Sequence, residues 1–257
     1  MRINFFEEYP TLNNLEKAKL IDFPSTIFLA AHSIEEFYKY KDNLLSINNK
    51  LEVAYWPIVP RTYWVSPFSY TEDLKNLFND LKQNKESLTI LIDLELPLLK
   101  NRFLFLKNIS SFLKNKKIIG SFLKDAQTYN LNIVTAEYCP FNSLFLSIYR
   151  KLGISFDPEI FKNNICYMYY TSMFPNKYIY KKMTSLLSSL KKSGNKNIEL
   201  GLGAIAIGVQ GNEPNLPPED LSRDLSFMKD NNFETATIFR LGGFNEEYYK
   251  AIKPFII

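Results

Sequence analysis

The chain has 257 residues, of which 46% are hydrophobic and 23% charged, and a formal net charge of +4. The mild charge is spread over short lysine pairs, which excludes the continuous basic stripe of a nucleic-acid-binding protein. No stretch approaches the ~20 apolar residues of a membrane span. The first ten residues, MRINFFEEYP, lack the apolar run of a secretion signal. We therefore expect a soluble cytoplasmic protein with no nucleic-acid or membrane partner.

Short apolar segments alternate with longer amphipathic ones along the whole chain. The predicted strands are residues 25–31, 51–57, 88–95, 131–138, 165–172, 198–204 and 235–241. The predicted helices are residues 33–47, 71–85, 102–114, 118–129, 143–152, 178–192, 218–231 and 245–253. This alternation indicates an α/β protein with a parallel sheet covered by helices. At this length it favours a single domain over residues 1–257, folded as a closed (β/α)₈ TIM-like barrel.

An eighth strand is harder to place. The segment RTYWVSPF at 61–68 has strand-like composition, but it follows the strand at 51–57 too closely for a parallel crossover, which takes about a dozen residues or more. It is either an irregular loop at the active site or part of a degenerate β/α unit. A short strand hidden between residues 102 and 129 is a third option.

The strand LTILIDLE at 88–95 turns acidic at its end. Side chains alternate along a strand, so Asp93 and Glu95 share one face with Leu91, whereas the opposite face is aliphatic throughout. In a closed barrel the aliphatic face packs against helices, and the other face opens to solvent at the C-terminal rim, where barrel enzymes place their chemistry. We expect Asp93 and Glu95 to point inward at this rim.

Other predicted strands also end in polar side chains. By the same reasoning Glu137, Arg240 and Tyr169 are expected on the inner face at the rim. Three carboxylates in one cavity would raise the pKa of at least one of them, which leaves a neutral acid beside a charged carboxylate. This is the pair that cleavage of a glycosidic bond requires. Asp93, Glu95 and Glu137 are therefore the predicted catalytic residues, with Glu95 or Glu137 as general acid.

Two loops offer further candidate ligand contacts. Tyr55, Trp56 and Trp64 lie in a proline-interrupted stretch after the second predicted strand, and their rings could pack on the faces of a sugar. The glycine-dense stretch GLGAIAIGVQGNEP at 201–214 contains Gln210 and Glu213, which could face the same cavity. Its spacing matches neither common phosphate-binding loop.

The sequence also resembles a known enzyme group. IDLEL contains the D-x-E that ends the signature of chitinase-like glycoside hydrolases, and MYYT resembles their later M-x-Y-D motif. This resemblance implies a glycoside-hydrolase-type barrel with Glu95 as proton donor, Asp93 as its partner and Tyr170 as a substrate contact. Leu88 and Leu91 replace the upstream acids of that signature.

The sequence thus predicts a carbohydrate-active barrel that hydrolyses a glycosidic bond of a small-molecule or oligosaccharide ligand. Arg240 would hold a carboxylate ionised or contact the substrate. A single histidine and two widely spaced cysteines give no metal-binding motif, so no cofactor is expected. Two alternatives stay open. One is an enzyme for a phosphorylated small molecule that uses Mg²⁺ held by the three carboxylates. The other is an inactive barrel used for binding.

Overall fold

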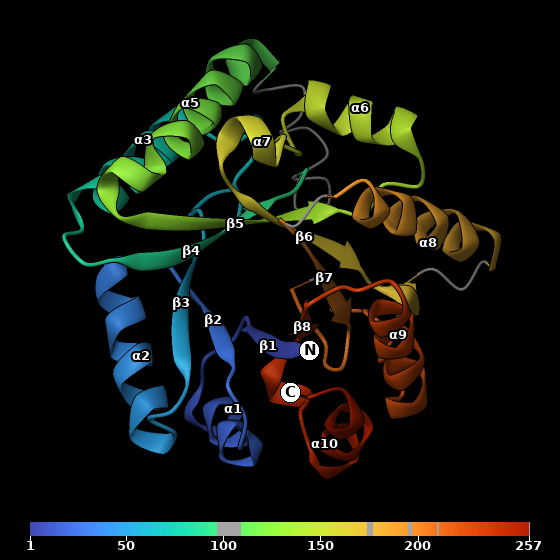
Figure 1. The fold of residues 1–257 in the computed structure, drawn as a ribbon. Helices are drawn as coiled ribbons and strands as arrows, with labels where there is room; N and C mark the ends of the chain where they lie inside the picture. The colour runs from blue at the N-terminus through green and yellow to red at the C-terminus, as the bar shows by residue number, and fades with distance from the viewer. Residues whose placement is uncertain (97–108, 174–176, 195–196, 210, 257) are drawn as a thin grey trace.

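Eight parallel strands form the centre of the protein (Figure 1). The computed structural model describes residues 1–96, 109–173, 177–194, 197–209 and 211–256. Neighbouring strands pair in chain order, and β8 pairs with β1, so the sheet closes. The strands are β1 (Arg2–Glu7), β2 (Thr26–Ala31), β3 (Glu52–Pro57), β4 (Leu88–Leu94), β5 (Leu131–Tyr138), β6 (Asn164–Tyr169), β7 (Ile198–Gly203) and β8 (Thr235–Phe239). The predicted (β/α)₈ barrel is confirmed.

Helices surround this ring on its outside (Figure 1). They are α1 (Leu12–Leu15), α2 (Ile34–Ile47), α3 (Thr71–Gln83), α5 (Phe112–Asp125), α6 (Ser143–Leu152), α7 (Pro158–Phe161), α8 (Lys177–Lys192), α9 (Pro218–Asp230) and α10 (Glu246–Ile252). The predicted helix at 102–114 falls largely outside the described residues, and α5 replaces the helix expected at 118–129. The start of α2 follows from its sequence, because Ser33 Oγ accepts from the N–H of Glu36 and Glu36 accepts from the N–H of His32.

The eighth strand of the barrel is β1, at the start of the chain, a position that was not among the predicted strands. Ile3 and Phe5 of β1 pack outward, whereas Phe6 faces inward. The segment 61–68 is an irregular loop instead, held by one antiparallel bridge between Val59 and Tyr63 and one parallel bridge between Val65 and Leu94. The reading of this segment as a loop is therefore the correct one.

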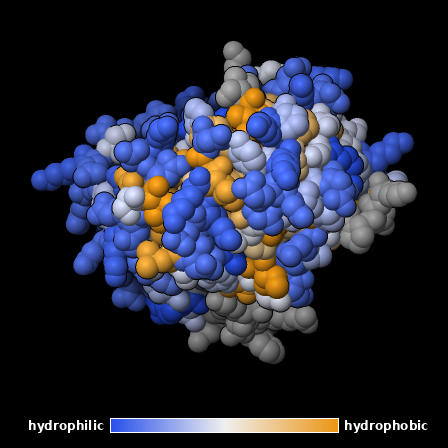
Figure 2. All heavy atoms as spheres, turned by 90° about the horizontal axis from the view of Figure 1, so that it is seen from below, coloured by the Kyte–Doolittle hydropathy of each residue, from blue (hydrophilic) through white to orange (hydrophobic). Residues whose placement is uncertain are grey.

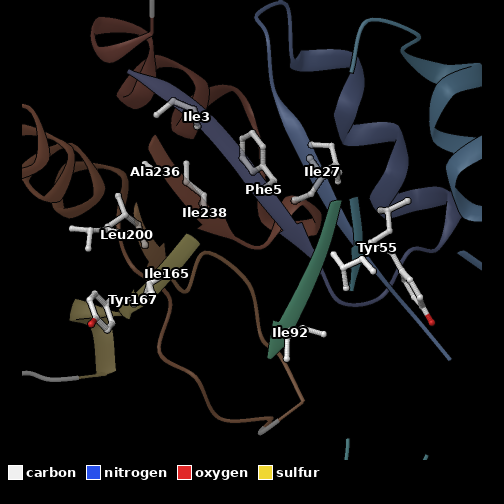
Figure 3. Packing of buried hydrophobic residues seen from close by; sticks show 14 of the residues in the cluster. Ile3, Phe5, Ile27, Tyr55, Ile92, Ile165, Tyr167, Leu200, Ala236 and Ile238 are labelled. Carbon is white, nitrogen blue, oxygen red and sulfur yellow. The ribbon is translucent and has the colours of Figure 1, made fainter. Parts of the chain in front are cut away.

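The buried side chains of the strands form two layers, because successive residues of a strand point to opposite faces of the sheet. The outer layer lies between the barrel and its helices, and Figure 3 shows part of it, including Tyr55, Ile92 and Tyr167. The inner layer fills the barrel and contains Phe6, Phe28, Ala30, Ala54, Trp56, Leu91, Val134, Ala136, Cys166 and Phe239. Small side chains are frequent in the inner layer because the interior of an eight-stranded barrel is narrow. The aliphatic face of β4 lies in the outer layer, as predicted.

The outer surface is mainly hydrophilic on the side that Figure 2 shows, and its hydrophobic residues lie in small groups between polar ones. Within the described residues, no helix combines the length and the apolar character needed to cross a membrane.

Candidate functional site

A cavity of about 140 Å³ opens at the end of the barrel where the strands terminate. It is lined by side chains from several strand ends and from the loops that follow them. Its aromatic lining includes Phe6, Trp56, Tyr63, Trp64, Tyr138 and Tyr170. Its carboxylates are Glu8, Asp93, Glu95 and Glu213. The cavity therefore combines apolar ring faces with a few acidic groups, as is typical of small-ligand sites.

Strand β4 carries one of these carboxylates, Asp93, and Glu95 is the first residue after the strand. Asp93 is paired in register with Ala136, and both line the cavity, whereas Leu94 between the two acids packs outward. Asp93 is 5% exposed and Glu95 9%. The predicted inward orientation of both residues is confirmed, and their catalytic role stays a prediction.

Burial and mutual repulsion keep these two acids partly protonated. Burial raises the pKa of Glu95 to about 7, the charge of Glu8 raises it too, and the Tyr138 hydroxyl, which donates to Glu95 Oε2 at 2.9 Å, opposes the rise. Burial also raises the pKa of Asp93 well above its usual value, with further increases from the charges of Glu95 and Glu8. The Trp56 indole N–H beside Asp93 lowers this pKa. Burial therefore favours the protonated form of both acids.

Glu8 is a lining carboxylate that the sequence analysis missed. It follows β1 directly, and alternation along Asn4, Phe6 and Glu8 directs it inward. The Tyr63 hydroxyl donates to Glu8 Oε1 from the irregular loop after β3. Burial raises the pKa of Glu8 to about 7, and the nearby charge of Glu213 adds to this. The alternation was visible in the sequence, but the segment was not recognised as a strand.

The structure separates the predicted aromatic contacts into two groups. Trp56, Trp64 and Tyr170 line the cavity, as expected. Tyr55 does not, because its neighbour Trp56 occupies the inward position. Its ring stacks on Phe37 of α2 at a centroid distance of 4.9 Å.

Tyr169 is also wrong as a ligand contact, for the same reason of alternation. Met168 and Tyr170 point inward, so Tyr169 points outward. There it packs against Tyr180 of α8 and Phe227 of α9, with centroid distances of 5.9 and 5.6 Å.

Glu137 lies outside the cavity, which corrects the expectation of three converging carboxylates. It is paired in register with the outward-facing Leu94 and is fully buried between the barrel and its surroundings. Glu137 Oε1 accepts from the Thr135 hydroxyl at 2.8 Å and from the backbone N–H of Phe156 at 3.1 Å. Burial raises the pKa of Glu137 to about 7, opposed by these contacts and by Ser155. Glu137 thus anchors the chain that follows α6.

Glu137 should make stability depend on pH. Its pKa rises from 4.5 in the unfolded chain to about 7 in the folded protein, so the folded state binds the proton more tightly between these values. Stability from this group is greatest below pH 4.5 and falls as the pH rises towards 7. We expect Glu137→Gln to gain about 3 kcal/mol relative to the parent between pH 4.5 and pH 8. Urea unfolding at several pH values measures the free energy of unfolding of both proteins. If this free energy changes with pH in the same way in the variant and the parent, the prediction is wrong.

The glycine-dense loop after β7 contributes Glu213 to the cavity. Glu213 Oε2 accepts from the backbone N–H of Gly208 at 3.1 Å. A Cβ on Gly208 would lie 2.6 Å from the Phe239 ring and 2.8 Å from Glu8, so glycine is needed for this close approach. Gln210 lies outside the described residues.

Arg240 does not line the cavity, contrary to prediction. Its guanidinium pairs with Glu7 at 3.0 Å and donates to the carbonyl of Ile207 at 3.1 Å. Glu7 lies on the outward face of β1 and also accepts from the N–H groups of Tyr9 and Gly242. Arg240 therefore ties the end of β8 to the end of β1, beside the cavity.

The Mg²⁺ hypothesis required Asp93, Glu95 and Glu137 to lie together, and they do not. Asp93 and Glu95 are on the inner face of the barrel, whereas Glu137 is on the outer face. Among the described residues, no group of three or more His, Cys, Asp or Glu side chains is placed to hold a metal ion. In the loop after β7, the backbone N–H of Gly208 donates to Glu213, so it is not free to bind a phosphate group.

Comparisons with known proteins give similarity in structure only. No family model and no curated protein matches the sequence. The C-terminal domain of a putative chitinase from Desulfitobacterium hafniense superposes with a TM-score of 0.62 at 10% identity, covering 99% of this chain and 97% of that one. The chain therefore shares the closed (β/α)₈ barrel fold of this chitinase domain.

Two further structures share this fold. A GH18 chitinase from Pseudoalteromonas aurantia gives a TM-score of 0.60 at 9% identity, with 99% of each chain covered. The PgaB glycoside hydrolase domain from Bordetella bronchiseptica gives 0.55 at 12% identity, covering 98% of this chain and 96% of that one. At these identities the agreement concerns the fold, and the resemblance read from the D-x-E motif is confirmed at that level.

Proposed function

We propose that the protein hydrolyses a glycosidic bond of an oligosaccharide bound in the cavity. The observation that carries this proposal is the placement of Asp93 and Glu95 at the end of β4, where both are buried in an aromatic cavity that opens at the barrel rim. Glycoside hydrolysis uses two carboxyl groups, one of them protonated. The solved barrels of similar fold include chitinases, which makes oligomers of N-acetylhexosamine the first substrates to test.

Glu95 is the proposed general acid. Its pKa of about 7 keeps much of it protonated at neutral pH, and the proton is available to the oxygen of the leaving sugar. The departing oxygen takes this proton as the bond to the anomeric carbon breaks, which leaves positive charge on the sugar ring. Asp93, two positions earlier on the same face, is the proposed stabiliser of that charge in its ionised form. A water molecule then adds to the anomeric carbon and gives a proton to the Glu95 carboxylate, which completes the hydrolysis and restores the acid.

Aromatic rings supply the binding surface. Trp56, Trp64 and Tyr170 line the cavity, and Phe6 contacts Trp56 edge-on at a centroid distance of 5.8 Å. Such rings pack on the apolar faces of pyranose units and exclude water from the reacting bond.

The charge arrangement favours an active site over an inactive barrel. Within the described residues, Glu8, Asp93 and Glu95 form no ion pair with lysine or arginine. Arg240, which could have neutralised them, pairs with Glu7 instead. Buried acids without a neutralising partner are costly to a fold and are a common feature of catalytic sites.

The test is an assay for new reducing ends with β-linked oligomers of N-acetylglucosamine, glucosamine and glucose, four to six units long. We expect turnover of at least one hexosamine oligomer, with defined shorter products. If no oligosaccharide of any of the three series is cleaved, the proposed hydrolysis is wrong.

Tyr138 should set the pH range of this activity. Its hydroxyl donates to Glu95 Oε2 at 2.9 Å and holds the Glu95 pKa below the value that burial alone would give. We expect Tyr138→Phe to raise the Glu95 pKa further, which moves the alkaline limb of the kcat/KM profile to higher pH. Tyr149→Phe is the matched control, because that ring also lines the cavity. A profile that shifts equally in both variants, or in neither, would count against the role of Tyr138.

A further inference from the structure

Glu8 borders the cavity, but both of its carboxylate oxygens are directed at the protein. Its side chain is buried, with only 6% of the residue exposed. Glu8 Oε1 accepts from the Tyr63 hydroxyl. Glu8 Oε2 lies beside Gly208, and the backbone N–H of Val209 donates to the same carboxylate. Glu8 is therefore bound to two loops of the chain, and the proposed hydrolysis gives it no part in the chemistry.

The place of β1 in the ring explains how one side chain reaches both loops. Strands pair in chain order, so β1 is two strands from β3 and two strands from β7, and β3 and β7 lie on opposite sides of the barrel. Tyr63 belongs to the irregular loop after β3, and Val209 belongs to the loop after β7. Glu8, directly after β1, joins these two loops beside the cavity.

Tyr63 has a backbone conformation that is unfavourable for its residue type. Its φ of 70° lies in the left-handed region, which residues other than glycine rarely adopt. Residues in such conformations persist where the surrounding structure holds them, and they are frequent at functional sites. Two backbone hydrogen bonds with Val59, at 2.8 and 2.9 Å, hold the main chain of Tyr63, and Glu8 holds its side chain.

The Tyr63 ring packs against Trp64. The two rings meet edge-on at a centroid distance of 5.1 Å, and both line the cavity. The backbone carbonyl of Trp64 accepts from the hydroxyls of Thr62 and Ser69, each at 3.1 Å, so the base of this loop is held without Glu8. The contact with Glu8 therefore fixes the Tyr63 ring, and through it the cover over the 3% exposed Trp64.

We propose that Glu8 is a positioning residue, which fixes the Tyr63 ring against Trp64 and against the loop after β7 so that this aromatic wall is ordered before a sugar binds. The role rests on the proposed glycosidase function, because the wall belongs to the same cavity. A binding surface that is already ordered loses less conformational entropy when the ligand binds. Loss of the contact therefore weakens substrate binding, whereas Glu95 still protonates the leaving oxygen.

Tyr63→Phe tests this role, because it removes the hydroxyl and keeps the ring. The chain has two tryptophans, Trp56 and Trp64, and both line the cavity, so quenching of their fluorescence by acrylamide reports on this cavity alone. We expect the quenching constant to rise in the folded variant, and KM to rise about tenfold with kcat within about twofold of the parent. Tyr40→Phe is the matched control, because the Tyr40 hydroxyl donates to Glu36 Oε1 at 2.8 Å on α2, outside the barrel.

Glu8→Met removes the acceptor oxygens from the other side of the contact and should give the same changes. If Glu8→Met does not fold, Tyr63→Phe decides. The inference is overturned if Tyr63→Phe leaves the quenching constant, or the KM of a cleaved substrate, at the parent value, or if Tyr40→Phe changes them equally. Increased quenching without cleavage of any oligosaccharide would remove the hydrolysis and keep Glu8 as the residue that holds this wall. Cleavage with both values unchanged would do the reverse.

Discussion

Replacing Glu95 by Gln is expected to lower kcat about 10³-fold on any oligosaccharide that the protein cleaves. The amide keeps the size of the side chain and can still accept from the Tyr138 hydroxyl, but it has no acidic proton for the leaving oxygen. General acid catalysis by a positioned side chain contributes roughly 10²–10⁴-fold, and KM should change little because substrate contacts remain. In the parent, kcat/KM should fall tenfold per pH unit above about pH 7, where Glu95 loses its proton.

Glu137→Gln is the matched control for this experiment. Glu137 is another buried glutamate with a pKa of about 7, on the adjacent strand, but it faces away from the cavity. Its replacement should leave kcat unchanged at 25 °C. Steady-state kinetics with a leaving group that needs no protonation adds a second check, because Glu95→Gln should then recover much of its rate. Equal losses in the two variants, or a fully active Glu95→Gln, would show that Glu95 is not the acid.

Arg240→Ala should destabilise the fold by about 3 kcal/mol, because it leaves the fully buried Glu7 without its cationic partner. Burial already raises the pKa of Glu7 against the opposing effect of Arg240, so Glu7 will take up a proton in the variant, which limits the loss. Thermal unfolding should show a decrease in Tm on the order of 10 °C.

Arg61→Ala is the corresponding control on the surface. Arg61 donates to both carboxylate oxygens of Asp73 at 2.8 and 2.6 Å, but its side chain is 47% exposed. Exposed pairs contribute little to stability, so its Tm should stay close to that of the parent. A similar Tm for both variants would mean that the Glu7–Arg240 pair does not hold the two strand ends together.

The barrel and the acids of β4 could be predicted because the sequence of that strand is asymmetric. Ile90, Ile92 and Leu94 form an aliphatic face that packs against helices. Asp93 and Glu95, on the opposite face, must therefore point into the barrel. Trp56 and Trp64 line the cavity, as expected from a segment rich in aromatic residues and proline after the second predicted strand.

Strand β5 shows why the rest could not be predicted in the same way. Both faces of LNIVTAEY are largely apolar, so alternation by itself does not tell which face is inward. In the folded protein Val134 and Ala136 face the inside of the barrel, whereas Ile133 and Glu137 are directed outward. Size does not separate the two faces either, because on β3 the large Trp56 faces inward and Tyr55 faces outward. Strand β1 was missed because Glu7 and Glu8 look like surface residues, and only the folded protein supplies Arg240 and Tyr63 as their partners.

Closure of the ring by β1 and β8 has a consequence for biosynthesis. Strand β1 is the first of the eight strands along the chain, yet one of its two hydrogen-bonding neighbours, β8 at residues 235–239, is the last of them. Until then Phe5, Phe6 and Glu8 have no completed surroundings, and the ribosome-bound chain exposes an unpaired edge that neighbouring chains could join. Assembly therefore depends on contacts between the most distant parts of the chain, which slows folding. A protein that lacks β8 would lose the pairing of β8 with β1, and it would also lose Phe239 from the lining of the cavity.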